Sequence, residues 1–220
     1  MVCIEKQQVS SRIQVIKQNL SQCSEEAKAL QEYFQKITAQ IVQISNQIDG
    51  LELEASNLQR EINSIHVPTP DEDDPSSVEM YQQAMRRIQQ LQARRQNMLN
   101  KAALLREKRS LCQEKKRQVS EKKTMLAGFC RERADLVGRM GSLLLKEAQR
   151  LCTEVKGFLS RIEGTRFSGS ATEAVQTAEQ NAGWYRQAAQ IMENLRQGFQ
   201  ALAESLDEGE DRQKVKTLVR

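Results

Sequence analysis

The chain has 220 residues, of which 39% are hydrophobic, 4% aromatic and 28% charged, with a formal net charge of +4. This balance is typical of elongated helices that each carry one narrow apolar stripe, and it argues against a wide globular core. No apolar run approaches the roughly 18 residues that a membrane-spanning helix needs, and residues 1–10 lack the apolar core of a signal peptide. We therefore expect no transmembrane segment and no Sec-dependent export.

A heptad repeat runs through the first third of the chain. Sixteen consecutive positions, separated alternately by three and four residues, carry no charged side chain. This pattern predicts a helix from about Val9 to Ile65 that supercoils with another helix. These seam positions are Ile13, Ile16, Leu20, Cys23, Ala27, Leu30, Phe34, Ile37, Ile41, Ile44, Ile48, Leu51, Ala55, Leu58, Ile62 and Ile65.

The segment 66–77 contains all three prolines of the chain together with four acidic residues. Proline does not fit a helix interior, so this segment predicts a loop at which the chain reverses. Ser76 and Glu79 have the spacing of a capping box, which predicts a second helix from Val78 onward. That helix is expected to reach about residue 163, either unbroken or with a kink or break near Gly128.

A second reversal is predicted at 164–169, the segment Gly164-Thr165-Arg166-Phe167-Ser168-Gly169. Ser170 and Glu173 again have capping-box spacing, so a third long helix is expected from Ala171. The last stretch, 209–220, is predicted to be a frayed polar tail.

Together these elements predict an all-α fold of elongated antiparallel coiled-coil hairpins with three long helices. The expected division is a hairpin over 1–127, a second hairpin over 128–208 and the tail over 209–220. If the two reversals are centred near residues 72 and 167, Ile13 lies opposite Arg131 and Leu206 lies opposite Gly128. The outer helices would then cover successive halves of the middle helix.

The middle helix carries a strongly basic segment. Thirteen Arg or Lys residues but only three Glu lie between Arg86 and Lys123. Such a segment is typical of a solvated coiled-coil face, or it binds nucleic acid, an anionic membrane or an acidic protein. No aromatic side chain lies there to stack on a base, which argues against nucleic acid as a partner. The candidate basic face consists of Arg86, Arg87, Arg94, Arg95, Lys115, Lys116 and Arg117.

Several basic residues of this segment also interrupt the heptad of the middle helix. Arg95, Arg109, Lys116 and Lys123 occupy positions where the repeat calls for apolar side chains. Three interpretations remain open. The long stems cover the seam while the charges stay in water, the first helix keeps part of its stripe for another chain, or the phase shifts. In the last case the apolar positions become Leu104, Leu111 and Met125.

Nothing in the sequence indicates catalysis, a metal site or a cofactor. His66 is the only histidine, and the acidic residues of the first loop lack the glycine and downstream glutamate of a calcium loop. The five scattered cysteines form no CxxC pair, which favours a reducing compartment. We therefore expect a protein that is not an enzyme.

The turn Phe167-Ser168-Gly169 lies between two helical stretches of about 35 residues each. This arrangement resembles the WXG/LXG-like superfamily, small helical hairpins of type VII secretion with an aromatic-x-Gly turn. The resemblance covers about 126–206, with Phe in place of the usual Trp. It implies that Phe167 and Gly169 form the hairpin turn. The apolar stripe through Tyr185, Met192 and Phe199 would then pack the hairpin or face a partner.

These observations predict a helical adaptor or accessory protein that binds a partner protein, or another copy of itself, through coiled-coil faces. In the sharper version, it is a WXG-like partner of an effector that a bacterial type VII system secretes. The alternatives are a cytosolic coiled-coil scaffold, a protein like the stalks of export ATPases, and a nucleic-acid binder. The expected location is the cytoplasm, or outside the cell after export with a partner by a non-Sec route.

Overall fold

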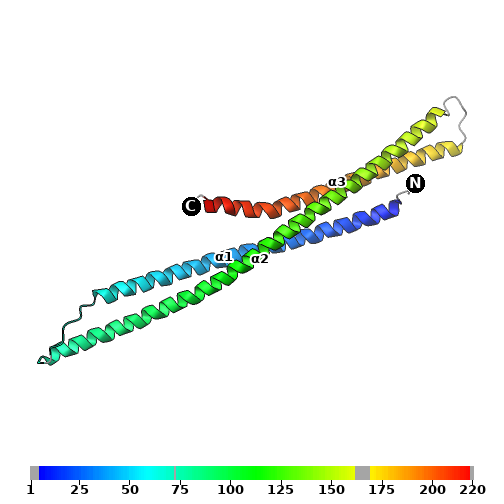
Figure 1. The fold of residues 1–220 in the computed structure, drawn as a ribbon. Helices are drawn as coiled ribbons and strands as arrows, with labels where there is room; N and C mark the ends of the chain where they lie inside the picture. The colour runs from blue at the N-terminus through cyan, green and yellow to red at the C-terminus, as the bar shows by residue number, and fades with distance from the viewer. Residues whose placement is uncertain (1–4, 72, 162–168, 219–220) are drawn as a thin grey trace. The chain divides into compact units, whose positions relative to one another are not determined.

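The computed structural model describes residues 5–71, 73–161 and 169–218. It contains three helices, α1 (Lys6–Ser64), α2 (Pro75–Arg161) and α3 (Gly169–Leu218), and no strand within these ranges (Figure 1). The all-α prediction is confirmed. A search of the described helices for a stretch long and apolar enough to cross a membrane finds none.

The seam predicted for the first helix is confirmed along α1. Each of its sixteen positions is buried or half-buried, and Ala27, Ile37 and Ile48 are among the most deeply buried. Side chains spaced alternately by three and four residues return to one face of a helix. The uncharged stripe of α1 is therefore its packing face.

The start of α2 is capped by a residue other than the predicted one. The Asp74 carboxylate accepts a hydrogen bond from the backbone N–H of Ser76 at 3.0 Å, and Pro75 is the first helical residue. An aspartate at the N-cap followed by proline at the first position suits a helix start, since proline lacks the N–H that would otherwise need a partner. Ser76 lies inside the first turn, so its assignment as the cap is wrong.

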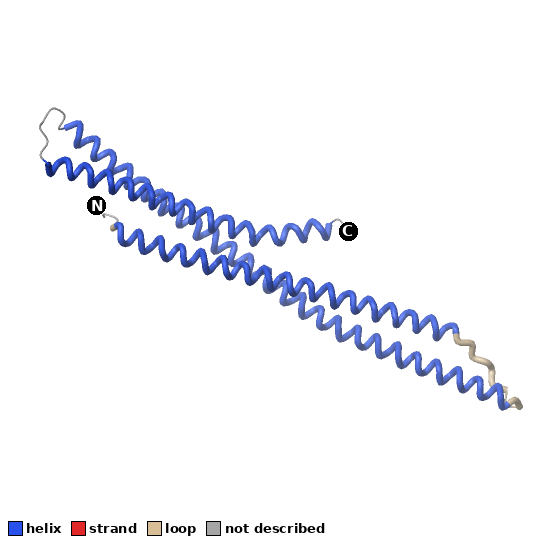
Figure 2. Tube along the Cα trace, turned by 180° about the vertical axis from the view of Figure 1, so that it is seen from behind, coloured by secondary structure: helices blue, strands red, loops and turns tan. Residues whose placement is uncertain are grey.

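Helix α2 continues through Gly128 without interruption, which excludes the alternative with a break there. The predicted tail is also wrong, because α3 continues to Leu218. Residues 210–218 are mostly Glu, Arg, Gln, Lys and Leu, which are good helix formers, and the single Gly209 costs only about 1 kcal/mol. Figure 2 distinguishes these helices from the described loop between α1 and α2.

The chain divides into two compact units, and the helices α1 and α2 contribute to both. One unit, here called the bundle, combines Met1–Gln31 with Glu121–Arg220. The other, here called the hairpin, is Glu32–Ser120. This division differs from the predicted one, because the first part of α1 packs with α2 and α3 rather than belonging to a separate two-helix hairpin. Buried residues from all three helices form one core in the bundle.

The pairing register within the hairpin is shifted from the prediction. Centring the reversal near residue 72 would place Ser45 opposite Leu99, yet Ser45 accepts a 3.5 Å hydrogen bond from Arg109. A non-helical residue advances the chain by up to about 3.3 Å, against about 1.5 Å in a helix. The non-helical stretch 65–70 therefore carries the chain beyond the end of α1 before α2 begins, and moves the pairing along α2.

The bundle shows the same direction of shift. Predicted pairing would place Cys23 opposite Glu121, but Cys23 contacts Cys130, nine residues further along α2. The α2–α3 pairing agrees better with prediction, since Arg131 of α2 forms an ion pair with Asp207 of α3. As a result α1 overlaps α3 along α2 instead of meeting it end to end.

Candidate protein-interaction surfaces

The apolar stripe through Tyr185, Met192 and Phe199, which was predicted to pack the second hairpin or to face a partner, lies inside the bundle. Tyr185, Met192 and Phe199 are all buried, and Met192 and Phe199 have no exposed surface. They pack in the core formed by α1, α2 and α3. The prediction that they face a partner is therefore wrong, and the alternative that they pack the helices holds.

Within the bundle, the first part of α1 packs against α2 and α3. A Cβ built on Gly198 of α3 would approach the Leu20 side chain of α1 to 2.8 Å, so the two helices are in close contact there. The Lys6 ammonium lies 5.6 Å from the centre of the Trp184 ring, and the Gln31 amide donates to the Ser205 carbonyl. A face on which an external helix would otherwise pack is thus occupied by α1.

Most of the predicted hairpin turn Phe167-Ser168-Gly169 lies outside the described residues. Phe167 lies outside the described residues, and Gly169 is the first residue of α3. The aromatic-x-Gly turn therefore stays a prediction.

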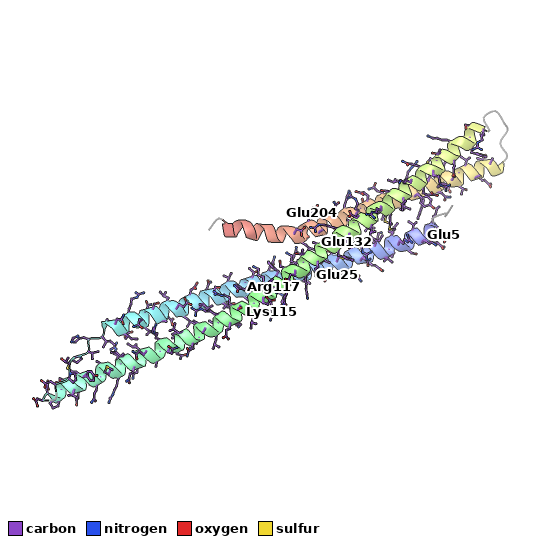
Figure 3. The ribbon with its side chains drawn as sticks, viewed as in Figure 1. Glu5, Glu25, Lys115, Arg117, Glu132 and Glu204 are labelled. Carbon is purple, nitrogen blue, oxygen red and sulfur yellow. The ribbon has the colours of Figure 1, made fainter. Side chains whose placement is uncertain are left out.

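The predicted basic face does not form a single surface in the hairpin. Arg86 and Arg94 line an open groove with Leu91 and Glu61, and Arg87 forms an ion pair of 3.1 Å with Glu61. Figure 3 labels Lys115 and Arg117 on α2. Arg117 forms an ion pair of 2.8 Å with Glu114 one turn earlier, and Lys115 is exposed.

The basic residues of the hairpin that interrupt the heptad turn toward the seam. Arg95 and Arg109 are half-buried, and the half-buried Lys116 ammonium lies 4.9 Å from the centre of the Phe34 ring. Burial lowers the pKa of Lys116 because it penalises the charged form. Basic stems therefore cover the seam in the hairpin, as the first interpretation expects. The Lys116 ammonium departs from that interpretation, because it is partly desolvated rather than in water.

The alternative in which the heptad phase shifts is wrong. Leu104 and Leu111 of the hairpin are each 66% exposed, and Met125 of the bundle is 74% exposed. These side chains do not enter the packing face of α2. The basic residues keep the seam positions, and large apolar side chains remain in solvent on the same helix.

In the bundle, the exposed apolar residues of α2 follow a helical stripe. Met125 is followed four residues later by Phe129, and Leu136 and Leu143 continue at intervals of seven. Phe129 is 39%, Leu136 49% and Leu143 55% exposed. At about 100° per residue these four positions fall within a sector of about 40°, roughly a third of a turn from the buried face. We call these four residues the outer stripe.

Sequence reasoning missed the outer stripe as a site, although its signal was present. Phe129, Leu136 and Leu143 repeat every seven residues beside a second, buried repeat that includes Cys130, Val137 and Leu144. Two adjacent heptad stripes on one helix indicate two packing faces. Among the described residues, the buried stripe is covered and the outer stripe stays exposed.

Two buried thiols lie close together in the bundle core. Cys23 of α1 and Cys130 of α2 are near enough that each thiol affects the pKa of the other. Burial is the main cause that raises the pKa of both thiols, that of Cys130 to about 11. A thiol held neutral is a poor nucleophile and a poor metal ligand. Among the described residues no group of three or more His, Cys, Asp or Glu side chains is placed to hold a metal ion.

Comparison with known proteins gives no family for this chain. No protein-family model matches it, and neither a curated protein nor a solved structure does.

Proposed function

We propose that the chain is a non-enzymatic helical adaptor that binds a helix of another protein molecule through the outer stripe. The observation that carries this proposal is the exposure of Phe129, Leu136 and Leu143 at heptad spacing on a helix whose other face is already packed. Large apolar side chains that recur on one exposed helix face often mark a protein-interaction site. A helix with matching heptads is the partner that such a row fits.

The resemblance of 126–206 to the WXG/LXG-like superfamily suggests a finer version of this proposal. In that version the bound helix belongs to a secreted effector of a type VII system. The adaptor would present the outer stripe, because the α2–α3 stripe is covered by α1 in the same chain.

Site-specific photo-crosslinking tests the adaptor proposal. A photoreactive phenylalanine analogue is placed at position 136 of the full chain in the cells that naturally produce it. Position 145 is the matched control, since Leu145 belongs to the same helix and is 47% exposed, close to the 49% of Leu136. Nine residues separate the two positions, which places them on opposite sides of α2.

We expect a defined adduct from position 136 and none from position 145. Mass spectrometry of the adduct identifies its second component as a different protein or as another copy of the chain. Equal labelling from both positions, or no adduct from position 136, would overturn the proposal that the outer stripe is a binding face.

A further inference from the structure

We infer that the outer stripe pairs with the same stripe of a second copy of this chain, with the two α2 helices antiparallel and a twofold axis near Leu136. This inference rests on the proposed function and names its partner. Its first support is the symmetry of three of the four stripe residues. Phe129 and Leu143 each lie seven residues from Leu136, so an antiparallel pair centred there places Phe129 of one copy against Leu143 of the other.

The charges that flank the stripe reverse in sign about the same centre. Glu132 lies four residues before Leu136 and Arg139 three residues after it, and both side chains are exposed. Figure 3 labels Glu132 on α2. In an antiparallel pair Glu132 of each copy approaches Arg139 of the other, which gives two equivalent ion pairs. A parallel pair in register would place like charges together. The charge pattern therefore selects the antiparallel arrangement.

Neither of these two charges, Glu132 and Arg139, has an ion-pair partner among the described residues. They cannot pair with each other, since seven residues along a helix separate them by about 10 Å. A second copy supplies both missing partners at once, and a twofold axis makes the surface self-complementary.

Sedimentation equilibrium of the full chain tests the inference. We expect a dimer that dissociates on dilution over roughly the micromolar range, as suits an interface of modest area. Leu136→Glu introduces like charges at the axis and should raise the dissociation constant at least about tenfold, because it removes the central apolar contact. Leu145→Glu, on the opposite side of α2, should leave it unchanged. Circular dichroism verifies that both variants keep their helix content.

A charge exchange tests the direction of pairing. Glu132→Arg alone should weaken the dimer, because the introduced arginine meets Arg139 of the other copy, and Arg139→Glu should weaken it for the converse reason. Mixing the two variants should restore association as a heterodimer, since each copy then faces opposite charges.

Three results would overturn the self-pairing. They are a chain that stays monomeric at all concentrations, a dimer that persists in Leu136→Glu, and single charge variants that associate as tightly as the original chain. If the chain is monomeric but position 136 still crosslinks to a different protein, self-pairing fails while the adaptor proposal stands. If the chain is monomeric and position 136 gives no crosslink, both the self-pairing and the adaptor proposal fail.

Discussion

Gly128 and Gly141 both lie within α2 but meet different surroundings. A Cβ at Gly128 would have no heavy atom within 4 Å, whereas at Gly141 it would lie 3.3 Å from the Cβ of Met192. Gly128→Ala should therefore stabilise the chain by up to about 1 kcal/mol through helix propensity alone. Gly141→Leu should destabilise it by about 1–3 kcal/mol through overpacking against α3. Urea denaturation followed by circular dichroism measures both changes.

Gly183→Ala serves as the control on α3, because a Cβ there also meets nothing within 4 Å. It should behave like Gly128→Ala. If Gly141→Leu proves as stable as the original chain, the close α2–α3 packing at that residue is wrong.

Cys130 gives a prediction with a defined pH window. Its pKa is raised from the ordinary 9.0 to about 11 by burial, so the thiol stays neutral in the folded chain after it has ionised in the unfolded chain. The associated stability is fully present below about pH 9 and is lost as pH rises toward 11. The Cys130→Ala variant lacks this contribution. As pH rises from about 9 to 11, the unfolding free energy of the original chain should therefore approach that of the variant.

Thiol labelling of the native protein provides an independent check on the same residue. At mildly alkaline pH, a maleimide should modify the half-buried Cys112 and Cys152 well before Cys23 and Cys130. Mass spectrometry of peptides distinguishes the sites. Early modification of Cys130 would contradict its placement in the core.

At the scale of single elements, the seam of α2 is destabilised by a partly buried charge that the sequence alone did not reveal. Lys116 sits where the heptad calls for an apolar residue, and burial lowers its pKa. The contact of its ammonium with the Phe34 ring stabilises the fold by about 0.5–1 kcal/mol. Burying a leucine side chain at the same position would stabilise it by about 1.5–3 kcal/mol. Lys116→Leu should therefore raise the unfolding free energy by about 1 kcal/mol.

Lys115→Leu is the matched control for that change. It makes the same substitution one residue earlier, at an exposed position, and should alter stability by less than about 0.5 kcal/mol. Equal effects of the two substitutions in denaturation experiments would show that Lys116 does not occupy the seam.

The sequence predicted elements more reliably than it predicted their pairing. The α1 seam is uniform, so its period alone defines the packing face, and the prolines locate the first loop. The α2 seam mixes apolar residues with Arg95, Arg109 and Lys116. The sequence therefore fits two interpretations equally well: basic stems that cover the seam, or a heptad whose phase shifts. Only the positions of Phe34 and Leu104 in three dimensions separate the two explanations.

For the whole molecule, the division into units depends on loop geometry that composition does not encode. The non-helical stretch 65–70 advances the chain further per residue than a helix does, and this shift brings Cys23 beside Cys130. The first part of α1 then joins the bundle core, which also buries Tyr185, Met192 and Phe199. The outer stripe is left as the candidate site because α1 covers the stripe that the sequence had favoured.

These differences in packing predict that protection from hydrogen exchange varies along α2. Residues 127–148 belong to the bundle, where Cys130, Ala134 and Val137 are fully or almost fully buried in a core shared by three helices. Residues 95–116 belong to the hairpin, where a single partner helix faces a seam interrupted by basic side chains. Local opening should therefore be more frequent in 95–116, and its amides should exchange at least about tenfold faster than those of 127–148.

Hydrogen exchange of the full chain, read by mass spectrometry, measures both segments in one experiment. Both lie well inside one helix, away from its ends, so end fraying cannot produce the difference. Lys116→Leu should slow exchange in 95–116, because it replaces a desolvated ammonium in the seam with an apolar contact. It should leave 127–148 unchanged, since those amides open with the bundle core. Uniform exchange along α2, or an equal response of both segments to the substitution, would show that the helix opens as one cooperative unit and that the basic seam does not weaken the hairpin.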